Sequence, residues 1–263
     1  MRHPKSKTGR ALAAAGLLAV VCVSGFAVAQ VIPRSGYLGD AADKTIALVG
    51  PPPAAGSPRA EADRAIFKAT RSLKGTPRWT MAQADFNERA VVSNMSCAIG
   101  TKMDLATMPA TLKLILQMAP DILRAGNAPK SFYARPRPYK IDPGETCGVL
   151  PASEDNFDYP SGHAAWGWAV ALVLAEMLPD RADAILVRGR AVGEGRAICG
   201  VHNYSSIVAG QTIAAAVVAA EHRNPAFQAD FAAAKVELEA ALKAKPLTEG
   251  CDAEAKMLAT PAW

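Results

Sequence analysis

The chain has 263 residues, of which 50% are hydrophobic and 6% aromatic, and its formal net charge at pH 7 is +5. This apolar content combined with a modest net charge excludes an intrinsically disordered chain. Much of the positive charge lies at the extreme N-terminus, so the basic balance does not indicate a nucleic acid as a specific partner.

The first 29 residues are typical of a secretory signal peptide. Residues 1–10 carry four basic side chains and no acid, residues 11–21 are apolar, and residues 27–29 form the Ala-x-Ala pattern of a cleavage site. We expect cleavage near Ala29 and a periplasmic or secreted protein. No later stretch reaches about 18 uncharged apolar residues, so we expect no stable membrane span after the signal is removed.

Four cysteines remain after cleavage: Cys97, Cys147, Cys199 and Cys251. In an exported chain this number predicts up to two disulfides, with three connectivities open. None of the cysteines has the spacing of a zinc site, so we expect no structural metal.

The N-terminal half predicts a leader and three helices. Residues 30–56 are rich in proline and glycine and predict an extended, loop-like leader. Ser57 and Thr76 each precede a proline, which is the pattern of an N-cap followed by the first helical residue. We expect helices from Ser57 to Gly75, from Thr76 towards Gly100, and from Asp104 onward.

The C-terminal half begins with a predicted loop. Prolines and glycines interrupt residues 126–160, and we expect a rigid loop there that includes Lys130 and Arg137. Helical spacing returns over four segments, and no run alternates like a strand. The sequence therefore predicts an all-α fold with one domain over residues 57–263. The four segments are residues 161–178, 180–197, 203–222 and 225–245.

Three clusters carry unusual chemistry. Residues 130–138 hold cations next to prolines, and arginine and lysine in such a loop suit an anion. Residues 159–163 place a histidine at a glycine-containing helix start, whose free N–H groups also favour an anion. Residues 195–206 place His202 six residues after Arg196, across a break at Gly200. A solvated basic loop, an ordinary helix cap and a polar histidine would each explain one cluster alone.

Taken together, the clusters form a set suited to handling phosphate. Fixed cations balance the charge of a phosphoryl group, one histidine attacks phosphorus, and the other protonates the leaving oxygen. No carboxylate cluster suggests a bound metal, so we expect the reaction to need neither metal nor cofactor.

At this point the sequence resembles a known family. Lys130 with Arg137-Pro138, residues 160–163 (Pro-Ser-Gly-His), and Arg196 with His202 are similar to the three motifs KxxxxxxRP, PSGH and SRxxxxxHxxxD of the type 2 phosphatidic acid phosphatase superfamily. The superfamily includes the vanadium haloperoxidases. Within it, the chain most resembles the class A bacterial non-specific acid phosphatases, which implies an all-α single-domain helical bundle.

The resemblance also implies roles for individual residues. His202 would be the nucleophile that forms a phosphohistidine, and His163 the general acid. The phosphate-binding residues would be Lys130, Arg137, Ser161, Gly162 and Arg196. The ligands would be small phosphorylated substrates, inorganic phosphate or vanadate.

Two positions depart from the family pattern. Gly195 stands where the motif has serine, and Ser206 stands where it has the aspartate that supports the nucleophile. We expect Ser206, four residues after His202, to share its helix face and hold its far nitrogen without supplying charge. In triad hydrolases the loss of an orienting carboxylate costs about 10⁴ in kcat. We therefore expect weakened turnover, and a gain of at least about 10-fold from Ser206→Asp, unless Asp155, Asp158 or Glu194 reaches His202.

Two other functions stay open at this point. The departures at Gly195 and Ser206 favour a phosphate-binding homologue without activity. A vanadate-dependent haloperoxidase would use the equivalent histidine as a ligand of the metal oxide. The apolar helix faces also leave open a homo-oligomer.

Overall fold

Helices make up nearly all of the regular structure in the part of the chain that the computed structural model describes, residues 33–148, 150, 156–247 and 249–263. These residues contain no strand, only an isolated antiparallel bridge between Thr101 and Pro246, so the all-α expectation is confirmed. The signal peptide expected over residues 1–29 lies outside the described residues. Across the described ranges, the α-helices are α1 (Ile46–Val49), α2 (Pro58–Thr70), α3 (Pro77–Ala84), α4 (Ser96–Ile99), α5 (Pro109–Tyr133), α6 (Gly162–Met177), α7 (Ala182–Ile198), α8 (Tyr204–Glu221), α9 (Pro225–Ala244) and α10 (Asp252–Leu258).

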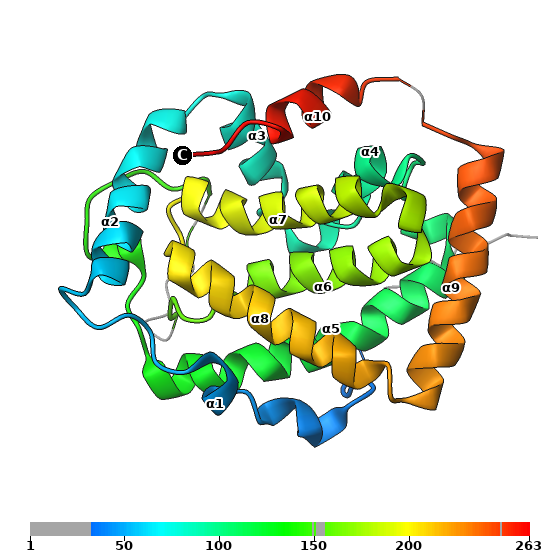
Figure 1. The fold of residues 1–263 in the computed structure, drawn as a ribbon, viewed down its shortest axis with the longest axis horizontal. Coiled ribbons are helices and arrows are strands. Elements are labelled where there is room, and N and C mark those ends of the chain that lie inside the picture. Colours follow the sequence, from blue (N-terminus) through cyan, green and yellow to red (C-terminus); the bar gives the residue numbers. More distant parts are fainter. Residues whose placement is uncertain (1–32, 149, 151–155, 248) are drawn as a thin grey trace, which may run out of the picture. The chain divides into compact units, whose positions relative to one another are not determined.

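Helix α6 is the central element, and it packs between α7 and α8 (Figure 1). It also contacts α5, which in turn packs against α9. Val170, Val173 and Leu174 of α6 are fully buried. The helix is apolar around most of its circumference because neighbouring helices cover it on several sides. Of the helices that the structure describes, none is long and apolar enough to cross a membrane.

The expected helix starts are confirmed where a capping side chain precedes a proline. Ser57 accepts a hydrogen bond from the N–H of Ala60, and Thr76 accepts one from the N–H of Trp79. In both helices proline occupies the first turn, where its missing N–H leaves no partner unsatisfied. The four helices expected between residues 161 and 245 are present as α6 to α9.

The helix expected over residues 76–100 is wrong beyond Ala84. Residues 85–99 instead form short 3-10 turns and the single turn of α4. Asp85 is buried here, and its carboxylate accepts hydrogen bonds at 2.7 and 2.8 Å from Arg188 of α7. The regular helix ends at this ion pair, because a buried charge must be paired. The following residues reach the N-terminal end of α6.

The loop expected over residues 126–160 is also wrong at its start, because α5 continues through Pro129. Proline has no N–H to donate to the carbonyl four residues earlier, which here belongs to Ala125. The hydroxyl of Thr45 donates a hydrogen bond to that carbonyl at 2.5 Å, so the acceptor stays paired. Lys130 consequently lies in the last turn of a helix.

The leader is more ordered than we expected. Its described part contains a 3-10 turn over Gly39–Asp43 and the short helix α1. The N–H of Leu38 donates to the carboxylate of Asp121 on α5 at 3.0 Å, and the carbonyl of Val49 accepts a hydrogen bond from the Tyr159 hydroxyl at 2.9 Å. The leader is therefore bonded to the helices.

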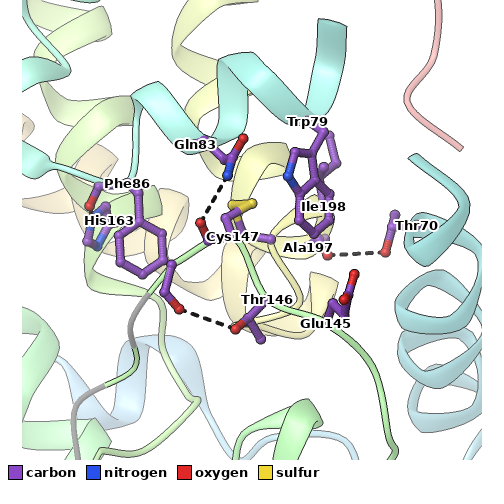
Figure 2. Close-up of a disulfide and its surroundings, with 12 residues drawn as sticks. Thr70, Trp79, Gln83, Phe86, Glu145, Thr146, Cys147, His163, Ala197 and Ile198 are labelled. Carbon is purple, nitrogen blue, oxygen red and sulfur yellow. Dashed lines mark hydrogen bonds between the residues drawn. A yellow bond between two sulfur atoms is a disulfide. The ribbon is translucent and has the colours of Figure 1, made fainter. Parts of the chain in front are cut away.

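Two disulfides form, and the structure resolves the pairing that the sequence left open. Cys147 is bonded to Cys199, and Cys97 to Cys251. The first joins the loop before α6 to the end of α7, where Gln83 of α3 also donates to the carbonyl of Cys147 at 3.2 Å (Figure 2). The second joins α4 to the start of α10, a helix that the sequence analysis did not predict.

Candidate active site

The turn that ends α7 lies between Arg196 and His202, which are six residues apart in the sequence. Gly200 has φ +69°, and its N–H donates to the carbonyl of Ala197 at 2.9 Å. The N–H of Val201 donates to the carbonyl of Arg196 at 3.0 Å. These two bonds make a Schellman motif, which requires a left-handed residue and so favours glycine. The turn reverses the chain and brings His202 back to Arg196.

The N-terminal end of α6 forms the second part of the site. The Ser161 hydroxyl caps the helix by accepting a hydrogen bond from Ala164 at 3.3 Å, and the N–H of Ser161 donates to the carbonyl of Ser206 at 2.9 Å. Beyond its own helix turn and chain neighbours, a Cβ atom at Gly162 would meet no atom of the described residues within 4 Å. Packing therefore does not require glycine there, and the first backbone N–H groups of the helix stay accessible to an anion.

Lys130 and Arg137 reach this region from α5 and from the segment after it. The Lys130 ammonium donates to the carbonyls of Pro160 at 2.7 Å and Phe157 at 3.2 Å. Arg137 Nη1 lies 2.8 Å from Nε2 of His202. Both cations are therefore held beside the start of α6 and the imidazole.

Arg196 is buried with unpaired donors. It is 4% exposed, and its Nε and Nη1 atoms have no hydrogen-bond partner among the residues that the structure describes. The guanidinium lies over the ring of Phe86, with 4.7 Å between Cζ and the ring centroid. Buried donors without acceptors are unfavourable, and an oxyanion would supply the acceptors.

The cations also repel one another. Burial and the charge of Arg137 lower the pKa of Lys130 to about 8 and that of Arg196 to about 9. Burial, followed by Arg137, Lys130 and Arg196, lowers the pKa of His202 well below its ordinary value. An anion bound among these residues would relieve the repulsion, which makes the cluster an electrostatic anion site.

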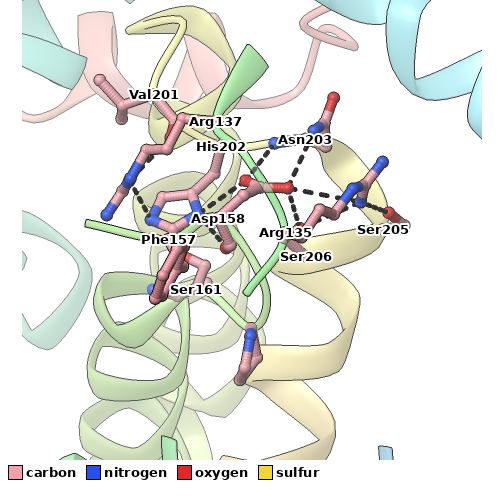
Figure 3. A network of polar contacts seen from close by, with 12 residues as sticks. Arg135, Arg137, Phe157, Asp158, Ser161, Val201, His202, Asn203, Ser205 and Ser206 are labelled. Atoms are coloured by element: carbon pink, nitrogen blue, oxygen red, sulfur yellow. Dashed lines mark hydrogen bonds and ion pairs between the residues drawn. The ribbon is translucent and has the colours of Figure 1, made fainter. Parts of the chain in front are cut away.

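The partners of His202 determine which nitrogen carries its proton. Nδ1 lies 2.7 Å from the carbonyl oxygen of Asp158 and 3.1 Å from its carboxylate (Figure 3). Nε2 faces Arg137, which can only donate. The hydrogen is therefore on Nδ1 and the lone pair on Nε2, so the ring is arranged as a nucleophile.

His163 faces acceptors on both sides. Its Nδ1 lies 2.8 Å from the Glu88 carboxylate, and its Nε2 lies 3.0 Å from the carbonyl oxygen of Phe86. Two acceptors favour the imidazolium, which is a proton donor. Burial and the charge of Arg196 act in the opposite direction and lower the pKa of His163. The ring is therefore charged only on the acid side of its usual range.

Ser206 does not hold His202 as we expected. His202 precedes α8 and its cap, so the helical relation between positions i and i+4 does not apply. The Ser206 hydroxyl instead donates to the carboxylate of Asp158 at 2.6 Å.

Gly195 lies in α7, where a Cβ atom would lie 3.4 Å from that of Ala82.

The structure thus brings Lys130, Arg137, Arg196 and His163 around His202, with Ser161 and Gly162 at the adjoining helix start. Sequence reasoning named Asp158 only as one of three candidate acids. Of the other two, Asp155 lies outside the described residues, and Glu194 is paired with Arg78 at 2.6 Å.

Several residues around the site were missed by the sequence analysis. Glu88, Phe86 and Asp63 come from segments outside the three motifs, and only folding brings them to the site. Arg135 lies within the first motif, at a position that the motif leaves variable. Within the described ranges, no group of three or more His, Cys, Asp or Glu side chains is arranged to bind a metal ion.

Comparison with known proteins identifies the family of the chain. The model of the PAP2 superfamily matches residues 107–228. An acid phosphatase of Zymomonas mobilis is 38% identical over 202 residues, which cover 73% of this chain and 75% of that protein. A non-specific acid phosphatase of Providencia stuartii is 35% identical over 239 residues, covering 84% of this chain and 96% of the relative. One from Salmonella typhimurium is 34% identical over 197 residues, with coverages of 72% and 77%. The chain therefore belongs to the PAP2 superfamily and is a homologue of the bacterial non-specific acid phosphatases.

Proposed function

We propose that the protein is an exported acid phosphatase that hydrolyses small phosphate monoesters through a phosphohistidine at His202. The observation that carries this proposal is the position of His202 Nε2, which lies 2.8 Å from Arg137 Nη1 among buried cations. Lys130, Arg137 and Arg196 would hold the phosphoryl oxygens together with the N-terminal end of α6. In this role, fixed cations neutralise charge that metal ions neutralise in other phosphatases.

The reaction follows from the positions of the two histidines. Nε2 of His202 attacks phosphorus, and the bond between phosphorus and the ester oxygen breaks. His163 exchanges the Phe86 carbonyl for the ester oxygen and gives it a proton, so the product is an alcohol. His163 then takes a proton from water, which attacks the phosphohistidine and releases phosphate.

The two histidines also predict an acidic pH optimum for the proposed reaction. Attack requires neutral His202, whose pKa is lowered well below its ordinary value of 6.5. Proton donation requires charged His163, whose pKa is also lowered from 6.5. Both conditions hold together only between the two pKa values, so the proposed optimum lies on the acid side of pH 6.5.

The test is phosphate release from an aryl phosphate by the mature protein from pH 4 to 8, with EDTA present and vanadate as inhibitor. We expect activity that EDTA leaves unchanged, vanadate inhibits, and His202→Ala abolishes. Phosphate trapped on the quenched protein should be stable to alkali and not to acid, as phosphohistidine is. It should be found in wild type and not in His202→Ala. Equal turnover in His202→Ala would overturn the proposal. Tight phosphate binding without turnover would identify a non-catalytic homologue instead.

A further inference from the structure

Asp158 lies at the centre of a buried network behind His202 (Figure 3). Its side chain is 0% exposed, and it precedes the Tyr159-Pro160 peptide that leads into α6. Asp158 Oδ1 accepts a hydrogen bond from the backbone N–H of Asn203 at 3.0 Å, and Oδ2 accepts one from the Asn203 amide at 2.8 Å. Asp158 is thus held against the start of α8, where a negative charge is favoured.

We infer that Asp158 is the positioning residue that supplies the carboxylate missing at position 206, which rests on the proposed function of His202 as nucleophile. Both oxygens that face His202 Nδ1, the carbonyl and the carboxylate, come from this one residue. They fix the Nδ1–H tautomer and leave the nucleophilic lone pair on Nε2, where it faces Arg137. The carboxylate also stabilises the positive charge that develops on the ring as the bond to phosphorus forms.

Ser206 supports the carboxylate. Its hydroxyl donates to Asp158 Oδ2 at 2.6 Å, and the side chain is 0% exposed. An aspartate at position 206 would therefore place a second buried carboxylate beside the first. Two adjacent buried carboxylates cannot both stay ionised without a large penalty. Positions 158 and 206 are thus alternative sources of a single negative charge, and we now expect Ser206→Asp alone to lower turnover.

A second layer compensates the buried charge. Arg135 Nη1 lies 3.3 Å from Asp158 Oδ2, and Arg135 Nη2 lies 2.9 Å from the carboxylate of Asp63 on α2. Asp63 also accepts a hydrogen bond from the N–H of Ser205 at 2.8 Å. Burial raises the pKa of Asp158, and Arg135, Ser206 and Asn203 limit that rise by favouring the carboxylate. The carboxylate of Asp158 is therefore a paired charge, because an isolated buried charge would be unfavourable.

The decisive experiment exchanges the two side chains. Kinetics on an aryl phosphate would compare wild type, Asp158→Asn, Asp158→Ser, Ser206→Asp and the double variant Asp158→Ser/Ser206→Asp. We expect Asp158→Asn and Asp158→Ser to lower kcat by about 10²- to 10⁴-fold with KM changed less than about three-fold. Ser206→Asp should lower kcat, and the double variant should exceed Asp158→Ser by at least about 10-fold.

Two measurements separate positioning from folding. The thermal unfolding midpoint and phosphate affinity of each variant show whether the fold and the cation cluster persist. Ser206→Ala is the matched control, because it removes one hydrogen bond to Asp158 and leaves the carboxylate, so its kcat should fall about 10-fold or less.

The inference is overturned by a kcat within three-fold of wild type in Asp158→Asn, or by a rise in kcat in Ser206→Asp. A folded double variant no more active than Asp158→Ser would also overturn it. These outcomes are distinct from failure of the proposed function, which would appear as equal turnover in wild type and His202→Ala.

Discussion

Gly210 of α8 packs directly against Ser161, the residue that caps α6. A Cβ atom at position 210 would lie 2.3 Å from the carbonyl oxygen of Ser161 and 3.1 Å from the backbone nitrogen of Ala165. The contact is to backbone, so no side-chain rotation can relieve it. Gly210 therefore sets the distance between α8, which follows the nucleophile, and the helix end that would bind phosphate.

We expect Gly210→Ala to destabilise the protein by roughly 1–3 kcal/mol, because overpacking forces the backbone to shift. The shift falls on the helix end that would bind phosphate, so KM should rise. Thermal unfolding and kinetics on an aryl phosphate measure both effects. The control is Gly195→Ala in α7, where a Cβ atom would lie an ordinary 3.4 Å from Ala82. Replacing a glycine inside a helix should stabilise this variant by about 0.5–1 kcal/mol. Wild-type stability and KM in Gly210→Ala would contradict the prediction.

Glu88 is expected to keep His163 protonated. Its carboxylate lies 2.8 Å from Nδ1, and it raises the pKa of His163 against the effects of burial and Arg196. In Glu88→Gln the pKa of His163 should fall further, so the descending limb of the pH profile should move to lower pH. Esters with poor leaving groups need protonation most, so alkyl phosphates should lose more activity than p-nitrophenyl phosphate. An equal loss on both substrates with an unchanged pH profile would argue against this role.

Glu221 gives stability a pH dependence that is independent of the active site. It is 0% exposed at the end of α8, and burial together with nearby Asp121 raises its pKa to about 9. The folded state keeps this proton between about pH 4.5 and 9 while the unfolded state loses it, so stability falls as pH rises through that window. We expect Glu221→Gln to match wild type near pH 4.5 and to unfold several degrees higher at pH 8. A constant difference in unfolding midpoint at all pH values would disprove the linkage.

The two disulfides should affect different properties. They close loops of 154 and 52 residues, for which chain entropy predicts stabilisation by about 5 and about 4 kcal/mol. Cys97→Ala/Cys251→Ala should therefore lower the unfolding midpoint at least as much as Cys147→Ala/Cys199→Ala. Activity should instead fall more in Cys147→Ala/Cys199→Ala, because Cys199 caps α7 three residues after Arg196. Turnover and unfolding of the two double variants, measured below both midpoints, provide the comparison.

Local chemistry predicted most of the helices from sequence. Capping residues and helical spacing identified α2 and α6 to α9, because these signals lie within a few residues of each helix start. The prediction failed where distant residues decide the outcome. Arg188 ends the helix expected after Thr76 by pairing with Asp85, and Thr45 lets α5 continue through Pro129.

The site shows the same division. The motif residues around His202 could be named from spacing, because one turn and one helix start position them. The source of the carboxylate could not, because Asp158 and Ser206 are 48 residues apart and meet only in the folded chain. Glu88 had no sequence signal, since its role depends on the break that follows α3.

The bond between Thr45 and Ala125 limits how far the chain can be shortened. The PAP2 match begins at residue 107 and contains Lys130, yet the helix that carries Lys130 depends on a hydroxyl from the leader. A fragment restricted to the matched segment would expose the carbonyl of Ala125 that Pro129 leaves unpaired, five residues before the lysine. The smallest autonomous unit of this protein is therefore larger than the segment that the superfamily model matches, and it includes part of the leader.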